Sequence, residues 1–259
     1  MITYNLLSKY KEIAHFCTDR EGGTSVGNYA SMNMSPFSGD QPEMVALNQR
    51  ILCDELGITT DKLILPYQTH GTEIHKIDES FIELFKEEKF HALYGTDALI
   101  TRLPNICIGI TTADCVPLLF FDPVKQVIAA AHAGWRGTCG RIGEKTIHSL
   151  ISNYQCNPAD ILVTIGPSIS PEVYEIGKEV MDNFGNEGFD LSEIITHRNK
   201  STYLDLWKAN KLSLENAGVQ SDHIEISSIC TFTEHDRFFS ARRLGIKSGR
   251  MLSGIMLKG

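Results

Sequence analysis

The sequence lacks any run of about 18 consecutive apolar residues, the length that a membrane-spanning helix needs. Its opening segment, MITYNLLSKYKEIAHF, shows neither a basic start followed by a long apolar run nor a small-residue cleavage site. We therefore expect neither membrane partners nor secretion. A linker rich in Pro, Gly and Ser is also missing, so the 259 residues (1–259) are predicted to form one domain.

The sequence lacks a paired cysteine framework, and positive charge is in deficit. The seven cysteines are odd in number and scattered, unlike the dense even framework of a small secreted protein. This pattern predicts a reducing, cytoplasmic compartment. A formal net charge of −8 opposes a phosphate backbone, so we expect no nucleic-acid partner, and any anion site must be local.

The rhythm of apolar residues predicts alternating helices and strands. Helical periodicity covers 42–56, 138–153, 171–184 and 203–217. Shorter apolar runs predict strands at 63–68, 97–101, 106–111, 117–121, 127–132, 161–165 and 224–229. The Asp-Pro pair at 122–123 marks a turn between two of them. We predict an α+β fold, a single domain with a mixed β-sheet core flanked by helices.

Three apolar runs end at a residue that can bind a transition metal. LILPYQTHG leads to His70, ICIGITTADC to Cys115 and VIAAAHAGWRG to His132. Strand ends can open onto the same edge of a sheet, so these side chains could converge although they lie far apart in sequence. Singly, each also fits an ordinary loop histidine or a small core cysteine. Two imidazoles and a thiolate suit zinc, with copper as the alternative, and three ligands leave a fourth position open for catalysis.

Several other residues are candidate contacts for an anion or a base. The turn GWRGTCG places Arg136 before a predicted helix, where backbone N–H groups could help to bind a phosphate. The tail FFSARRLGIKSGR clusters Arg242, Arg243, Lys247 and Arg250, which also fits a solvated basic face. Asn33 lies in a polar loop and could contact a base edge or a sugar hydroxyl.

These segments together resemble the YfiH/YlmD family, also called laccase-domain or multicopper polyphenol oxidases and associated with purine nucleoside phosphorylase activity. The matching pieces cover nearly the whole chain in order: REGGTSVGNYASMN, QTHG, TTADCVPLLFFD, AAAHAGWRGT, IGPSISPEVYEIG and FFSARRLGIKSGR. Two of these motifs depart from the family's pattern. Ala241 and Leu244 flank the two tail arginines where the family often has tyrosine and aspartate, and Ser168 replaces a frequent cysteine.

The resemblance implies that His70, Cys115 and His132 bind zinc. It also implies phosphorolysis of adenosine, inosine and methylthioadenosine, together with deamination of adenosine, with a purine nucleoside and phosphate as partners. We interpret Cys115, His132, Asp114 and Arg136 as catalytic residues, and Asn33, Arg242 and Arg243 as substrate-binding residues. Asp114 and His75 are the candidate acids for the departing purine.

Three alternatives use the same residues differently. Cys115 could be a nucleophile with His132 or His70 as its base, in an amide-cleaving enzyme that edits peptidoglycan precursors, an activity linked to relatives of the family. A true laccase would draw on about ten histidines, many in His-x-His pairs, whereas this chain has nine histidines and no such pair. A structural zinc site would need a fourth protein ligand. His75 is the nearby candidate, but we expect the strand that follows His70 to carry it away from the site.

Overall fold

The computed structural model describes all 259 residues, which form thirteen β-strands and nine α-helices. The strands are β1 (Ile13–Cys17), β2 (Leu63–Ile64), β3 (Glu73–Ile77), β4 (Thr96–Thr101), β5 (Cys107–Thr112), β6 (Val116–Asp122), β7 (Val127–Ala133), β8 (Leu162–Ile165), β9 (Glu175–Ile176), β10 (Ile195–Arg198), β11 (Ser201–Leu204), β12 (Ile224–Ile226) and β13 (Met251–Leu257). The helices are α1 (Pro42–Leu56), α2 (Glu79–Glu83), α3 (Lys86–Leu93), α4 (Trp135–Cys139), α5 (Ile142–Tyr154), α6 (Lys178–Asn186), α7 (Leu191–Ile194), α8 (Leu206–Asn216) and α9 (Ala241–Leu244).

Two mixed sheets pack face to face. The larger has six strands in the order β12-β8-β6-β7-β4-β3, and the smaller has four in the order β1-β13-β5-β2. In the larger sheet, β6 to β7 and β7 to β4 are antiparallel, while β3 to β4 and β12 to β8 are parallel. The two sheets therefore give the mixed architecture that the sequence predicts, although as a pair of sheets rather than one.

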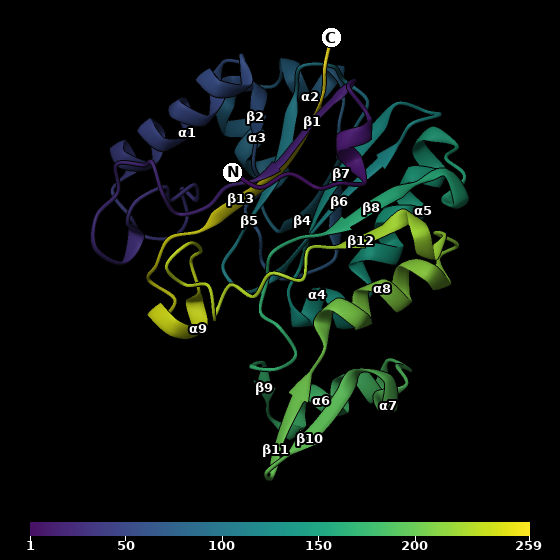
Figure 1. Ribbon diagram of the computed structural model, residues 1–259. Helices are drawn as coiled ribbons and strands as arrows, with labels where there is room; N and C mark the ends of the chain where they lie inside the picture. Colours follow the sequence, from purple (N-terminus) through teal and green to yellow (C-terminus); the bar gives the residue numbers. More distant parts are fainter.

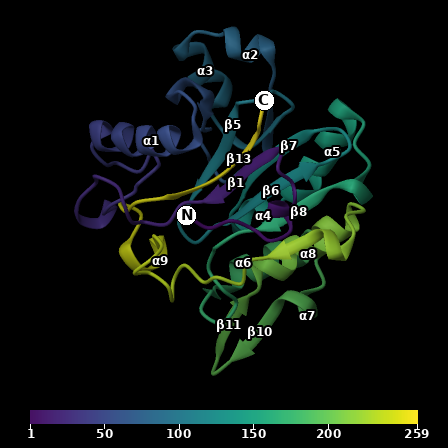
Figure 2. The ribbon, with the colours of Figure 1, turned by 45° about the horizontal axis from the view of Figure 1, so that its top comes forward.

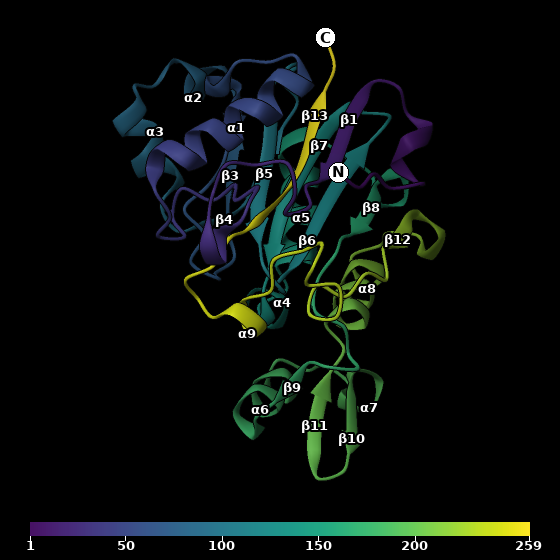
Figure 3. The same ribbon diagram turned by 60° about the vertical axis from the view of Figure 1, so that its left-hand side comes forward.

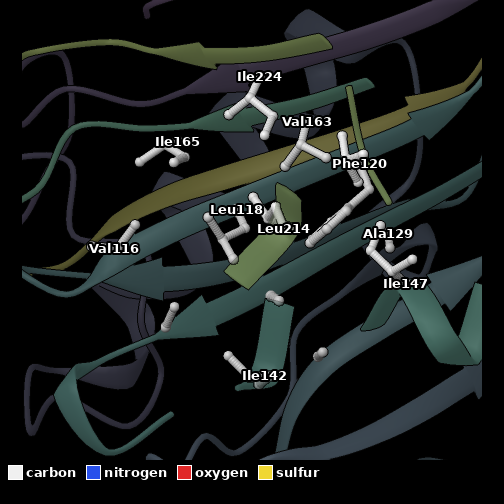
Figure 4. Packing of buried hydrophobic residues seen from close by; sticks show 14 of the residues in the cluster. Val116, Leu118, Phe120, Ala129, Ile142, Ile147, Val163, Ile165, Leu214 and Ile224 are labelled. Carbon is white, nitrogen blue, oxygen red and sulfur yellow. The ribbon is translucent and has the colours of Figure 1, made fainter. Parts of the chain in front are cut away.

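Strand β6 shows why the sequence contains an unbroken apolar run. Side chains alternate between the two faces of a strand. Leu118 and Phe120 join the hydrophobic cluster on the face that α5 and α8 cover (Figure 4). Leu119 and Phe121 join the cluster between the two sheets. Both faces of β6 are buried, so no position in its centre is left for a polar residue.

Helices cover the outer faces of both sheets. A third cluster, which includes Phe16, Leu52, Cys53 and Met256, packs α1 against the four-stranded sheet. Helices α5 and α8 lie on the opposite side of the molecule (Figures 2 and 3). The core thus has four layers: helix, sheet, sheet and helix.

A small third sheet, in the order β10-β11-β9, projects from this body together with α6 and α7 (Figure 1). The predicted helix over 171–184 is wrong in its first half, because Glu175–Ile176 pairs with β11 and α6 begins only after Gly177. The predicted helix over 203–217 begins at Leu206, where Asp205 caps it by accepting the N–H of Lys208.

The remaining predicted elements are confirmed with shifted ends. Helix α1 begins at Pro42 as predicted, and the Asp-Pro turn joins β6 to β7. The predicted helix over 138–153 is two helices, α4 and α5, separated at Gly140 and Arg141. The predicted strand over 63–68 is only Leu63–Ile64. No helix combines the length and apolar character needed to cross a lipid bilayer.

Candidate metal centre

Three segments meet at one end of the six-stranded sheet. His70 lies in the loop between β2 and β3, Cys115 in the turn between β5 and β6, and His132 near the end of β7. Val116 pairs with Ala133, which places Cys115 beside the end of β7. The ligand atoms of His70, Cys115 and His132 lie within 4.8 Å of one another. The predicted convergence of these side chains is therefore present in the fold.

Asp97 fixes the orientation of His132. It lies on β4, next to Ala98, which pairs with Ala131 on β7. Its Oδ1 accepts a hydrogen bond from His132 Nδ1 at 2.8 Å, and both side chains are buried. The proton on Nδ1 leaves the Nε2 lone pair free to bind a metal. A carboxylate behind a histidine ligand is the usual way in which proteins set the tautomer of that ligand.

Asp97 also holds the loop that carries His70. Its carboxylate accepts the backbone N–H groups of His70 at 3.0 Å, Gly71 at 2.7 Å and Thr69 at 3.2 Å. His70 has a positive φ of 64°, a conformation that costs a non-glycine residue energy unless its surroundings support it. One buried carboxylate thus positions two of the three residues of the cluster.

Gly134 provides the space that the cluster needs. A Cβ at this position would lie 3.0 Å from His70 Cδ2 and 3.1 Å from Cys115 Sγ. These contacts are tighter than side chains normally tolerate. A larger residue in place of this glycine of the HAGWRG segment would push against the cluster.

The electrostatics of the cluster favour a thiolate. Burial alone would raise the pKa of the Cys115 thiol, but the charges of His132 and His70 and hydrogen bonds to them lower it below its usual value. Burial alone would lower the pKa of His132, whereas Cys115 and Asp97 raise it. Burial would also raise the pKa of Asp97, but His132 and the N–H groups of the loop lower it. A deprotonated thiol is the form that binds metal ions.

The donor set fits zinc. Two imidazole nitrogens and one thiolate sulfur are typical zinc ligands, and a site with three protein ligands is of the open, catalytic kind. His75 does not join them, since it lies on β3 with its ring 5.3 Å from that of Phe81. As the sequence predicts, the strand that follows His70 carries His75 away from the cluster. Its position against Phe81 also argues against the acid role.

A cleft of about 350 Å³ opens onto the cluster. Its wall includes all three ligand residues, and its rim includes the exposed side chains of Phe37 and Ile246. This volume is within the range of small-molecule sites. The cluster thus faces a space that can hold a substrate.

Asp114 supports the site from behind. It has a φ of 85° and lies between β5 and Cys115. Its carboxylate accepts hydrogen bonds from Thr231 Oγ1 at 2.7 Å, Ser240 Oγ at 3.0 Å and the Arg242 backbone N–H at 2.7 Å. All these contacts tie the C-terminal segment to the turn that carries Cys115. This geometry favours a positioning role over the acid role that the sequence suggests.

Asn33 is not placed to contact a ligand. Its side chain is fully buried. Its amide donates to Ser38 Oγ and Asp40 Oδ2, and its Oδ1 accepts the N–H groups of Ser35 and Arg250. The prediction of a base or sugar contact is wrong, because every hydrogen-bonding group of the side chain already has a protein partner.

The three arginines selected from the sequence are exposed at the edge of the site. The guanidinium of Arg136 lies 4.2 Å from the ring centre of Trp135, and that of Arg242 lies 5.3 Å from the ring centre of Tyr174. Arg243 stacks on Phe232 instead, at 4.7 Å. None of the three lines the cleft.

Sequence reasoning missed Asp97 and Tyr174. Asp97 could have been found as the one carboxylate in the apolar run TDALIT, since a charge in a buried strand needs a partner. Burial, followed by the nearby charge of Cys115, raises the pKa of Tyr174 to about 12. No sequence signal distinguishes this tyrosine from the others.

Comparisons with known proteins agree with the fold. The family model described as multi-copper polyphenol oxidoreductase laccase matches residues 14–258. A purine nucleoside phosphorylase from Bacteroides thetaiotaomicron is 44% identical over 259 residues, covering 99% of this chain and 96% of the relative. Adenosine deaminase RL5, from an unknown prokaryotic organism, is 40% identical over 247 residues, covering 94% of this chain and 93% of the relative. The crystal structure of the hypothetical protein YfiH from Bacillus licheniformis matches with a TM-score of 0.89 at 33% identity, covering 95% of this chain and 93% of that chain.

Proposed function

Since the chain belongs to the multi-copper polyphenol oxidoreductase laccase family, we propose that it is a zinc-dependent purine nucleoside phosphorylase that also deaminates adenosine. The nucleosides we expect it to accept are adenosine, inosine and methylthioadenosine. The observation that carries the proposal is the open cluster of His70, Cys115 and His132 at the wall of a cleft of about 350 Å³. The names of the two relatives supply the substrate class.

In phosphorolysis, a phosphate oxygen forms a bond to C1′ of the ribose while the bond from C1′ to the purine nitrogen breaks. The electron pair of that bond leaves with the purine, which takes up a proton. We assign the holding of the metal to His70, Cys115 and His132, and its support to Asp97. When bound, zinc supplies a Lewis acid that can polarise an oxygen of substrate or lower the pKa of a water. We retain Arg136 and Arg242, at the edge of the site, as proposed contacts for the phosphate.

A multicopper oxidase would need several copper sites with many histidines. The structure assembles a single group of three His and Cys ligands. We therefore propose zinc as the resident metal, with copper as the alternative ion at the same three residues.

The test is a product assay on zinc-loaded protein of measured metal content. With adenosine and phosphate, the wild type is expected to release adenine and ribose 1-phosphate, and without phosphate it should form only inosine. Cys115→Ala should lose both reactions, while Cys156→Ala, at a buried cysteine outside the cluster, should retain them. A fully zinc-loaded wild type that turns over no purine nucleoside would overturn the proposal.

One further observation favours a second candidate. Cys115, His132 and Asp97 form a sequence of contacts in which the carboxylate orients the imidazole and the imidazole favours the thiolate. This is also the arrangement of a cysteine hydrolase. Such an enzyme could cleave an amide in a peptidoglycan precursor. It would work without metal, and zinc would inhibit it, so activity in chelator-treated protein separates the two candidates.

A further inference from the structure

Outside the metal-binding cluster, one side chain of the cleft carries a formal charge, and the proposed reaction gives it no role. Fourteen residues line the cleft, and Arg250 is the only lysine or arginine among them. None of the fourteen is Asp or Glu. A cleft with a fixed positive charge and no carboxylate is suited to an anion.

The guanidinium of Arg250 has no acidic partner. No carboxylate lies within 4.0 Å of it, although the side chain is partly buried. Burial lowers the pKa of Arg250, and the nearby charges of Cys115 and Asp114 oppose that effect. Charges removed from water are normally paired. An unpaired guanidinium in a cleft therefore indicates a ligand that brings the missing negative charge.

Backbone carbonyls hold this guanidinium in place. Nη1 donates to the carbonyl oxygens of Ser248 at 2.7 Å and Gly249 at 2.9 Å, and Nη2 donates to that of Ile246 at 2.9 Å. These bonds leave Nε–H and one N–H of Nη2 without a protein acceptor. Two free N–H groups on one planar guanidinium can bind two oxygens of a phosphate.

The main chain of Arg250 is fixed as well. Its N–H donates to Asn33 Oδ1 at 2.9 Å, and its carbonyl accepts the N–H of Met34 at 3.0 Å. Arg250 immediately precedes β13, whose first residue, Met251, pairs with Thr112 on β5. Thr112 lines the same cleft, and its buried hydroxyl has no partner in the protein. Asn33 therefore contributes to the site indirectly, by positioning Arg250.

We propose that Arg250 binds the phosphate co-substrate in this cleft, beside the metal cluster. This assignment rests on the proposed phosphorolytic function. It differs from the assignment of Arg136 or Arg242, because those side chains are exposed and stack on Trp135 and Tyr174 outside the cleft. A pre-positioned guanidinium would orient the phosphate toward the sugar without paying for the ordering of a flexible side chain.

The two reactions of the protein provide an internal comparison, since phosphorolysis needs phosphate and deamination does not. We would measure both with zinc-loaded wild type, Arg250→Gln and Arg250→Lys, and with Arg50→Gln as a control at an exposed arginine of α1. Arg250→Gln should raise the KM for phosphate about tenfold or more. Arg250→Lys should have a smaller effect, and deamination of adenosine should change less than about twofold in both.

An equal loss of both reactions in a folded Arg250→Gln variant would overturn the proposal, because it would show a structural or nucleoside-binding role. An unchanged KM for phosphate in Arg250→Gln would overturn it as well. If the KM for phosphate rose only in Arg136→Gln or only in Arg242→Gln, the phosphate contact would belong to that arginine instead. Inorganic phosphate should also raise the Tm of the wild type but not of Arg250→Gln. This binding assay needs no turnover. If the protein bound phosphate through Arg250 but turned over no purine nucleoside, the proposed function would be refuted while the assignment of Arg250 would be supported.

Discussion

The most informative substitution outside the ligands themselves is Asp97→Asn. It preserves the shape of the side chain and removes its charge. The amide oxygen can still accept from His132 Nδ1, but the NH2 group then faces the N–H donors of Gly71 and Thr69, which Oδ2 accepts in the wild type at 2.7 and 3.2 Å. Two acceptor contacts of a fully buried carboxylate are thus replaced by opposed donors.

The expected effect follows from these contacts. Hydrogen bonds to a charged group contribute about 1.5–3 kcal/mol each, so we expect a loss of about 3–5 kcal/mol in the free energy of unfolding. Native domains are stable by only about 5–15 kcal/mol, so this loss is a large part of the total. Removing the carboxylate behind a metal-binding histidine typically weakens metal affinity about 10–100-fold. We therefore expect Asp97→Asn to bind zinc about 10–100-fold more weakly than the wild type, because both His132 and the loop of His70 lose their support.

The assay is a competition titration of zinc against a chelator, together with urea unfolding of the same samples. Asp122→Asn is the matched control. Asp122 is equally buried and accepts two backbone N–H groups, from Val124 and Lys125, but it lies in the turn at the far end of β6. Both N–H groups donate to Oδ1 of Asp122, which an asparagine retains, so the control should lose less stability and keep its zinc affinity. Zinc affinity in Asp97→Asn within about twofold of wild type would refute the reasoning.

Three further predictions use other features of the structure. Gly134→Ala should lower zinc content and both activities while leaving the far-ultraviolet circular dichroism unchanged, because its Cβ would lie 3.0 Å from His70 Cδ2 and 3.1 Å from Cys115 Sγ; normal zinc binding would contradict this. After chelation, iodoacetamide should alkylate Cys115 before the other six cysteines, since they are all buried and its pKa is lowered; peptide mapping that shows equal labelling would argue against the thiolate. Burial and the charge of Lys258 lower the pKa of His15 to about 4, so the folded protein keeps it neutral while the unfolded chain binds a proton below about 6.5. The free energy of unfolding should therefore fall by up to about 3 kcal/mol between pH 6.5 and 4. In urea titrations, His15→Gln should show a smaller fall over this range. The same pH dependence in His15→Gln and the wild type would exclude His15 as the cause.

The parts of the fold that could be predicted are those in which the local pattern and the final packing agree. Residues 116–121 of β6 are all apolar because both faces of the strand are buried, and α1 has a proline at its first position. The projecting sheet could not be predicted in this way. Glu175–Ile176 forms a strand only because it pairs with β11, far along the chain, although β10 and β11 themselves form a local hairpin.

The same division applies to the site. His70, Cys115 and His132 could be selected because each is a metal-binding residue type at the end of an apolar run, and strand ends meet at one edge. The sequence does not show whether a polar loop residue such as Asn33 forms hydrogen bonds within the protein or to a ligand, and the structure shows bonds within the protein. Arg250 could be grouped with its basic neighbours from sequence, but only its place in the cleft separates it from Arg243.

The most direct test of the central claim is a titration of zinc into metal-free protein, followed by phosphate-dependent release of hypoxanthine from inosine. The account predicts that the rate rises in proportion to added zinc and stops rising at one zinc per chain, and that His132→Ala shows no such rise. Release that is already maximal without metal, or that falls as zinc is added, would contradict the account and favour the metal-free thiolate chemistry of Cys115.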